Sequence, residues 1–158
     1  MTDIQPATES ARSYFINDYL SRYGSFQDLA EQYADACIFT NRSLVATIND
    51  KIIGGITWSI KEGINSGLVE IFQMSILKEY RGKGYGSLLV EKCLQDIESF
   101  YCLRGYPLQR VYIIITESNI IGRNLYRNKD FYVAASLMNH RFVNQMDLFY
   151  VKDYFIKN

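Results

Sequence analysis

The chain has 158 residues, of which 48% are hydrophobic, so it is long enough and apolar enough to bury a core as one domain over residues 1–158. Its 17 Lys and Arg residues balance its 17 Asp and Glu residues without a dense basic run, which disfavours nucleic-acid partners. No apolar stretch approaches the ~20 residues that cross a bilayer. The first ten residues lack the pattern of a signal peptide, so we expect a cytoplasmic protein that does not act at a membrane.

Three cysteines, Cys37, Cys93 and Cys102, are odd in number and lack the spacing of metal ligands. They lie in apolar segments, so we expect reduced thiols in the core and no metal site. No partner base is evident beside them, which argues against covalent catalysis by a cysteine nucleophile.

The first part of the chain predicts an extended start, two helices and a hairpin. Residues 4–7 read as extended, and Thr8 is the expected N-cap of a helix over residues 9–23. Ser25 and Asp28 have the spacing of a variant capping box for a second helix, whose apolar face carries Leu29, Ala30, Tyr33, Ala34 and Cys37. The segments SLVATI and KIIGGITWSI then flank Asn49 and Asp50, a pattern typical of a β-hairpin.

The second part alternates strands with helices. LVEIFQMSI, residues 68–76, predicts a third strand, and residues 84–103 predict the longest helix, with apolar residues recurring every three or four positions. RVYIIIT reads as a strand buried on both faces, often in parallel pairing. Residues 119–128 read as a helix, and FYVAASLM and MDLFYV as closing strands. The expected fold class is therefore α+β, an α/β sandwich around one mixed sheet.

The turn YRGKGYG joins the third strand to the longest helix. It places Gly82, Gly84 and Gly86 at every second position, beside the cations Arg81 and Lys83. A helix N-terminus has backbone N–H groups without internal partners and a positive dipole end, so this turn is suited to bind a phosphate. The spacing fits neither the dinucleotide fingerprint nor the P-loop. A solvated turn is the simpler alternative.

Residues 70–89 resemble the acyl-CoA-binding motif of the GCN5-related N-acetyltransferase (GNAT) superfamily. The signature of that motif is Arg or Gln, two residues, Gly, one residue, then Gly or Ala, and it stands here as Arg81, Gly84 and Gly86. A second family segment is matched in part by Asn119, Gly122 and LYRNKDF, with Gly122 in place of the usual Ala and Asp130 in place of the usual Gly. The order of predicted elements is also similar to that of the family.

This resemblance implies a mixed, mostly antiparallel sheet of about seven strands with about four helices, whose splayed central strands form the acyl-CoA slot. It implies that acetyl-CoA (CoA) is the cofactor. The cofactor-binding residues would be Met74, Ser75 and Ile76 on the strand, Asn119 and Tyr126 beyond it, and the turn residues Arg81, Gly82, Lys83, Gly84, Tyr85, Gly86 and Ser87. The turn would hold the pyrophosphate, and the strand would pair with the pantetheine arm and polarise the thioester carbonyl.

Two residues are catalytic candidates by the same resemblance. Tyr126 occupies the position of a tyrosine that protonates the departing thiolate, although a plain packing role is the alternative. Glu70 resembles the general-base glutamate of the histone acetyltransferase branch, with a solvated strand residue or a water chain as the alternatives. Glu79 reads as a surface residue, and the lone His140 is weak evidence for a proton relay.

The resemblance implies an acetyl-CoA-dependent N-acetyltransferase, an acyltransferase acting on a primary amine of a small molecule or a protein by direct attack in a ternary complex. The alternatives are a non-catalytic acyl-CoA-binding or regulatory domain and a nucleotide-binding module. Tyr14, Tyr19, Tyr23 and Tyr33 would suit a cationic amine, but core packing explains them equally well. A homodimer is expected, in which the aromatic C-terminal strand MDLFYVKDYF pairs through its edge or inserts near a partner.

Overall fold

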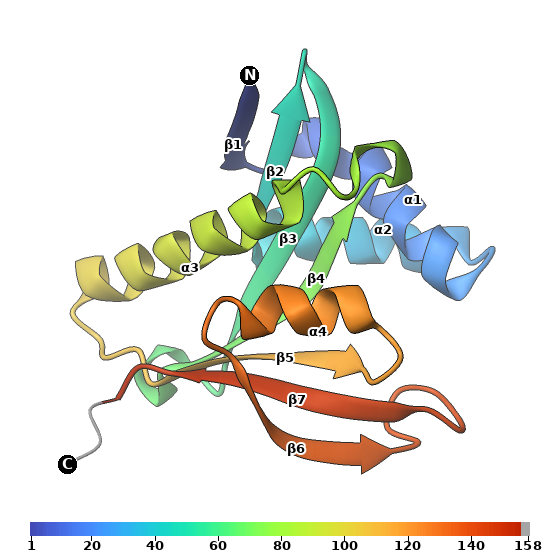
Figure 1. The fold of residues 1–158 in the computed structure, drawn as a ribbon. Helices are drawn as coiled ribbons and strands as arrows, with labels where there is room; N and C mark the ends of the chain where they lie inside the picture. The colour runs from blue at the N-terminus through green and yellow to red at the C-terminus, as the bar shows by residue number, and fades with distance from the viewer. Residues whose placement is uncertain (156–158) are drawn as a thin grey trace. The chain divides into compact units, whose positions relative to one another are not determined.

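The computed structural model describes residues 1–155 and contains seven strands and four α-helices within them (Figure 1). The strands are β1 (Thr2–Pro6), β2 (Arg42–Ile48), β3 (Lys51–Lys61), β4 (Leu68–Ile76), β5 (Arg110–Thr116), β6 (Tyr132–Met138) and β7 (Met146–Asp153). The helices are α1 (Arg12–Tyr23), α2 (Gln27–Asp35), α3 (Tyr85–Arg104) and α4 (Ile120–Arg127). The predicted α+β class and the order of elements are confirmed.

The strands form one mixed sheet in the order β1-β2-β3-β4-β5-β7-β6. β4 and β5 are parallel, through the pairing of residues 68–70 with residues 110–112. The described pairings of β1 with β2, β2 with β3, β5 with β7 and β6 with β7 are antiparallel. The prediction of burial on both faces of β5 is wrong, because buried and half-buried residues alternate along it. This alternation gives β5 one core face, as in an antiparallel strand.

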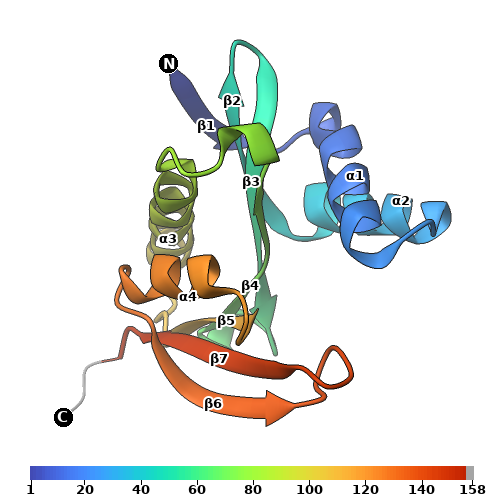
Figure 2. The same ribbon diagram turned by 45° about the vertical axis from the view of Figure 1, so that its right-hand side comes forward.

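The chain divides into two compact units, of which the first comprises Met1–Ser59 and Gln73–Cys93. In this unit α1 and α2 lie side by side on one face of β2 and β3, and the first half of α3 lies on the opposite face (Figure 2). Phe15, Ala30, Ile53, Ile56 and Leu89 are fully buried in it. The β2–β3 hairpin turns at Asn49 and Asp50, whose φ angles of +48° and +63° fit a two-residue turn.

The second unit comprises Ile60–Phe72 and the chain from Leu94 onward. Here α4 covers one face of β5 and β7, and β6 lies beside β7 at the margin of the sheet (Figure 1). Ile97, Val111, Tyr126 and Tyr150 are at most 2% exposed. Burial alternates along β5 because every second side chain, such as that of Val111, faces the helices. Tyr150 on β7 is buried on the same side of the sheet.

Two predicted helix starts differ from the structure. Thr8 precedes a 3-10 turn (Glu9–Ala11) and makes no capping bond to the backbone, and its hydroxyl lies 2.9 Å from the hydroxyl of Ser10. α2 has Phe26 at its N-cap without a side-chain cap, so the capping box of Ser25 and Asp28 is wrong. Local spacing indicated a cap, but the backbone enters the helix one residue later than the box requires.

The cysteine prediction holds for two of the three thiols. Cys37 and Cys93 are buried, whereas Cys102 is exposed near the end of α3. Burial raises the pKa of Cys37 to about 11, so this thiol stays protonated at neutral pH.

Among residues 1–155, no helix combines the length and the apolar character that a membrane span requires.

Candidate functional site

The glycine-opened turn lies in the first unit and leads directly into α3. Gly82 and Gly84 have φ angles of +74° and +85°, which L side chains rarely adopt. A Cβ atom at either position would meet no atom within 4 Å. The glycines are therefore required by the backbone path, not by crowding. Residues 81–84 are exposed, which leaves the surface of the turn accessible to a ligand as large as a pyrophosphate.

The start of α3 provides hydrogen-bond donors next to this turn. The N–H of Leu88 is bonded to the carbonyl of Gly84 at 3.1 Å, so the helix ladder begins there. The N–H groups of Tyr85, Gly86 and Ser87 precede it and have no acceptor within the helix. Together with the positive end of the helix dipole, these donors fit an anionic group.

Both cations of the turn have partners in the first unit. Arg81 Nε donates to the carbonyl of Ile76 at 2.8 Å, which ties the turn to the end of β4. Lys83 Nζ donates to the carbonyl of Glu79 at 3.1 Å and lies 5.6 Å from the centre of the Tyr80 ring. Glu79 is exposed and pairs with Lys51 at 3.2 Å, as expected for a surface residue. The turn therefore carries two cations, each of which donates to a nearby backbone carbonyl.

At the end of β4, the backbone N–H and C=O groups of successive residues point alternately toward β3 and toward the opposite edge of the strand. The N–H of Leu77 is bonded to the carbonyl of Ile53 in β3 at 2.8 Å. Because amide direction alternates along a strand, the peptide groups of Ser75 also face β3, and those of Met74 and Ile76 face the opposite edge. This is the orientation that main-chain pairing of Met74 and Ile76 with a ligand requires.

Tyr14 supports the end of β4 from α1. Its hydroxyl donates to the carbonyl of Ser75 at 3.0 Å and lies 2.6 Å from the Ser75 hydroxyl. A Cβ at Gly55 would lie 2.8 Å from Tyr14 Cε1, and one at Gly54 would lie 2.8 Å from the carbonyl oxygen of Ser75. The glycine pair of β3 is thus the sequence signal for this close packing, which the sequence analysis missed. Burial raises the pKa of the Tyr14 phenol, so it remains a neutral donor.

A polar cluster continues from Tyr14 into the same unit. Gln73 is 1% exposed, and its Nε2 lies 3.2 Å from the Tyr14 hydroxyl and 3.4 Å from Asp18 Oδ2. Asp18 Oδ2 also accepts from Arg22 Nη2 at 2.6 Å. Arg22 lies over the rings of Tyr23 and Tyr33, at 5.4 and 5.6 Å from their centres. Two of the four tyrosines predicted to suit a cation, Tyr23 and Tyr33, therefore already contact one, the guanidinium of Arg22.

Asn119 caps α4 in the second unit. Its Oδ1 accepts from the N–H of Gly122 at 2.9 Å. A Cβ at position 122 would lie 2.7 Å from Asn119 Nδ2, so the glycine makes room for this cap. The exposed Asn119 thus has a structural role, and its contact with a cofactor stays a prediction.

Tyr126 and Asp130 lie at the end of α4. Tyr126 is 2% exposed, and its ring packs edge-on against Phe131 with centroids 5.3 Å apart. The N–H groups of Lys129 and Phe131 both donate to the Tyr126 carbonyl, which closes the turn. Asp130 has a φ of +66°, in the left-handed region that glycine adopts most readily. The substitution therefore preserves the turn, since aspartate tolerates this region better than most residues.

Glu70 is engaged by a lysine in the second unit. Its carboxylate lies 2.6 Å from Lys61 Nζ, and its side chain is 17% exposed. It is in register with Tyr112 on β5, whose pKa is raised by burial and by the negative charge of Glu70. A general-base role for Glu70 would require the carboxylate to exchange Lys61 for the acceptor or a water molecule.

The predicted site residues thus form two groups. Met74, Ser75, Ile76 and the turn residues 81–87 lie in the first unit, and Arg81 joins the turn to the strand. Glu70, Asn119 and Tyr126 lie in the second unit. The convergence of the two groups around one ligand stays a prediction.

The mixed sheet, the four helices and the glycine-opened turn define a protein of the acetyltransferase class. A model of the acetyltransferase (GNAT) family matches residues 8–131, and the chain belongs to this family. The comparison with curated protein sequences gives no significant match.

Solved structures of acetyltransferases share the fold. The N-acetyltransferase from Staphylococcus aureus has a TM-score of 0.79 at 15% identity, over 97% of this chain and 98% of that one. The ribosomal-protein-alanine N-acetyltransferase from Brucella melitensis has a TM-score of 0.78 at 15% identity, over 96% and 99%. NAA60 from Arabidopsis thaliana, in complex with a bisubstrate analogue, has a TM-score of 0.75 at 17% identity, over 97% and 98%. At these identities the similarity shows the fold alone.

Proposed function

We propose that the chain is an acetyl-CoA-dependent N-acetyltransferase that transfers an acetyl group to a primary amine by direct attack in a ternary complex. The observation that carries this proposal is the turn at residues 81–84, which is exposed, has two glycines at positive φ and opens onto the N-terminus of α3. Membership of the acetyltransferase family supports it. Two of the similar structures are N-acetyltransferases by name, and a third holds a bisubstrate analogue.

The donor would be held mainly by backbone groups. The N–H groups of residues 85–87 would bind the pyrophosphate, with Lys83 and the N–H groups of the turn beside them. Because Arg81 is bonded to the carbonyl of Ile76, its part is to fix the turn relative to β4. The outward N–H and carbonyl of Met74 and the N–H of Ile76 would pair with the pantetheine arm, and a backbone donor of this strand would polarise the thioester carbonyl.

Acetyl-CoA supplies an acetyl group activated as a thioester. An amine with a pKa near 10 is almost wholly protonated at neutral pH, so it first loses one proton to Glu70, directly or through water. The neutral amine then forms the new C–N bond to the carbonyl carbon while the C–S bond breaks. Tyr126 donates a proton to the departing thiolate, and the nitrogen returns its second proton to the phenolate of Tyr126, directly or through water, so charge and atoms balance.

The alternative is a domain that binds acyl-CoA without turnover. Asp130 gave this alternative some weight, because glycine is usual at that position. The left-handed backbone at Asp130 removes the objection that the turn is lost. The choice between the two therefore rests on whether an amine is consumed.

The first experiment is a calorimetric titration with acetyl-CoA, CoA and ATP, combined with thermal unfolding. A ligand at 100 times its dissociation constant adds about 2.7 kcal/mol to the free energy of unfolding. We expect the two CoA species to bind and ATP to be weaker, and no response to either CoA species would overturn the proposal. Release of thiol with a panel of amines then separates enzyme from binding domain, with Tyr126→Phe expected to slow turnover at unchanged CoA affinity.

A further inference from the structure

The two margins of the sheet have opposite character. β1 forms one edge, and its sequence TDIQP carries the charge of Asp3 and the proline Pro6, both of which discourage pairing with another strand. β6 forms the other edge, and its sequence YVAASLM has neither a charge nor a proline. Natural proteins protect exposed edges explicitly, so the unprotected β6 calls for a physical explanation.

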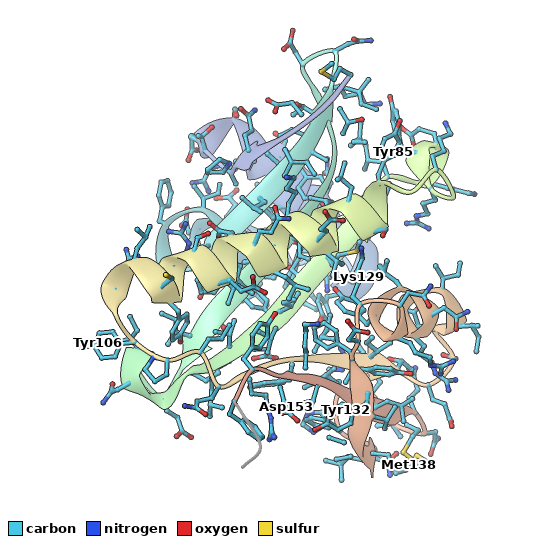
Figure 3. All side chains as sticks on the ribbon, turned by 60° about the vertical axis from the view of Figure 1, so that its left-hand side comes forward. Tyr85, Tyr106, Lys129, Tyr132, Met138 and Asp153 are labelled. Carbon is cyan, nitrogen blue, oxygen red and sulfur yellow. The ribbon has the colours of Figure 1, made fainter. Side chains whose placement is uncertain are left out.

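All seven residues of β6 are exposed. The large apolar side chains Tyr132, Val133, Leu137 and Met138 are exposed by 46%, 45%, 48% and 52%. Phe142 and Val143, in the connection to β7, are exposed by 37% and 79%. We call these six residues the β6 surface. Figure 3 labels Tyr132 and Met138 at the two ends of the strand.

The neighbouring strand β7 has both of its edges in use. It pairs with β5 through residues 147–153 and with β6 through residues 146–151. The expectation that the C-terminal strand would offer a free edge for a dimer is therefore wrong. It failed because the chain order does not show that β7 inserts between β5 and β6. Within the second unit, the edge available to another strand belongs to β6.

We propose that β6 pairs antiparallel with β6 of a second copy of this chain, about a two-fold axis. A strand that pairs with itself in this way meets its own sequence reversed. Because residues 132–138 contain no charge, no register of this pairing places like charges opposite each other or buries an unpaired charge. Uncharged side chains meet uncharged side chains in every register, with Ser136 and the Tyr132 hydroxyl as the polar groups of the strand, and the ladder satisfies the free backbone groups of the edge.

Pairing of β6 with β6 of a second copy is more favourable than pairing of β6 with β1 of a second copy. Joining β6 to β1 of another copy would bring Asp3 and Pro6 against an apolar strand and would build an open chain of molecules. The two-fold arrangement closes at two copies. One feature limits its extent, since the register of β6 on β7 shifts between Val133 and Ala135. Such a bulge disturbs regular pairing, so residues 135–138 form the central part of the interface.

Light scattering coupled to gel filtration tests the proposal on the whole chain. We expect a species of twice 18.3 kDa that dissociates on dilution. Leu137→Lys places a charge at the centre of the paired strands and should yield monomer. Leu103→Lys is the matched control, because Leu103 is 83% exposed and lies on α3 outside the β6 surface. The control should remain dimeric, and circular dichroism checks that both variants are folded.

Hydrogen exchange identifies the surface that is used. The amides of β6 that point away from β7 should exchange slowly in the wild type at high concentration and fast in Leu137→Lys. A wild type that is monomeric at all concentrations would overturn the proposal. So would a dimer that survives Leu137→Lys with fast-exchanging β6 amides, because its interface would lie elsewhere. Growth into filaments would equally contradict the closed two-fold pairing.

Discussion

Asn119 Oδ1 accepts a hydrogen bond from the N–H of Gly122 at 2.9 Å, and the space that a Cβ at position 122 would fill is occupied by the Asn119 amide. The two residues therefore form one capping unit for α4. Alanine is usual at this position in the family, and here it would sit 2.7 Å from Asn119 Nδ2. An alanine at position 122 would therefore require the Asn119 side chain to shift.

This coupling predicts that Gly122→Ala changes the free energy of unfolding by different amounts in two backgrounds. Alanine favours a helix over glycine by about 1 kcal/mol, and loss of an asparagine cap costs about 1 kcal/mol. Gly122→Ala alone should therefore leave the free energy of unfolding nearly unchanged. In the Asn119→Ala background it should raise that free energy by about 0.5–1 kcal/mol. Urea denaturation of the four proteins measures the coupling, and additive effects would show that the contact is not strained.

The left-handed backbone at Asp130 predicts that the stability of variants at this position depends on how well the new residue tolerates a positive φ. Its φ of +66° suits glycine, and its carboxylate lies 3.6 Å from Lys152 Nζ at an exposed position. Asp130→Gly should change the free energy of unfolding by less than about 0.5 kcal/mol, because the exposed ion pair contributes little and glycine relieves the backbone. Asp130→Val should cost about 1–2 kcal/mol, since a β-branched residue is poorly accommodated there. Equal stability of the two variants would contradict this assignment.

Local patterns sufficed for the turn, the helices and the strands, because each depends on neighbouring residues. The spacing of Gly82, Gly84 and Gly86 predicted the turn before α3, and the apolar spacing predicted α3 to within one residue at each end. The contact of Tyr14 with Ser75 joins residues 61 positions apart, so no local pattern contains it. Leu29 belonged to the expected buried face of α2 and is 46% exposed, because periodicity shows which residues share a face but not how much of it is covered. The exposure of β6 escaped prediction for the same reason.

The contact between Gly55 and Tyr14 predicts a large effect of one methyl group. Gly55→Ala places a Cβ 2.8 Å from a ring carbon of Tyr14, and the ring is fixed by its bond to Ser75. Overpacking of this kind typically costs about 1–3 kcal/mol in free energy of unfolding. Gly24→Ala is the comparison variant, because a Cβ at position 24 would meet no atom within 4 Å. Its φ of +86° means that this variant measures backbone strain without overpacking.

Tyr14→Phe should separate packing from hydrogen bonding at the same place. The ring is kept, but the carbonyl of Ser75 loses its donor, so we expect a loss of about 1–2 kcal/mol in denaturant unfolding. Under the proposed function, CoA affinity should also fall, because Ser75 lies between Met74 and Ile76. A variant with unchanged stability would show that the 3.0 Å contact contributes nothing.

The proposed role of Glu70 predicts a large loss of rate when its carboxylate is replaced. If Glu70 accepts the amine proton, Glu70→Gln should lower kcat by about 10²–10⁴-fold in a thiol-release assay. Lys61→Met is the companion variant, since it releases the carboxylate that the lysine holds at 2.6 Å. A Glu70→Gln enzyme with an unchanged kcat would assign the deprotonation to a water chain, while leaving the proposed transfer intact.

Asp147 predicts the pH dependence of folding stability. Its side chain is 1% exposed and accepts from Arg141 Nε at 2.8 Å and from Arg141 Nη2 at 2.7 Å. These bonds hold the pKa of Asp147 below its ordinary value of 3.8. A carboxyl whose pKa is lower in the folded state stabilises the fold fully above its unfolded pKa, and this contribution disappears as the pH falls through the folded pKa.

Asp147→Asn should therefore lower the free energy of unfolding at neutral pH by about 2 kcal/mol, an amount reduced by the partial exposure of Arg141. The difference between wild type and variant should vanish at pH values well below 3.8, where the wild-type carboxyl is also uncharged. Urea denaturation over a pH series measures this difference directly. Asp28→Asn, at an exposed position of α2, is the control and should show little difference at any pH. A gap between wild type and Asp147→Asn that persists in acid would mean that the amide disturbs packing, because only the charge interaction depends on the protonation of Asp147.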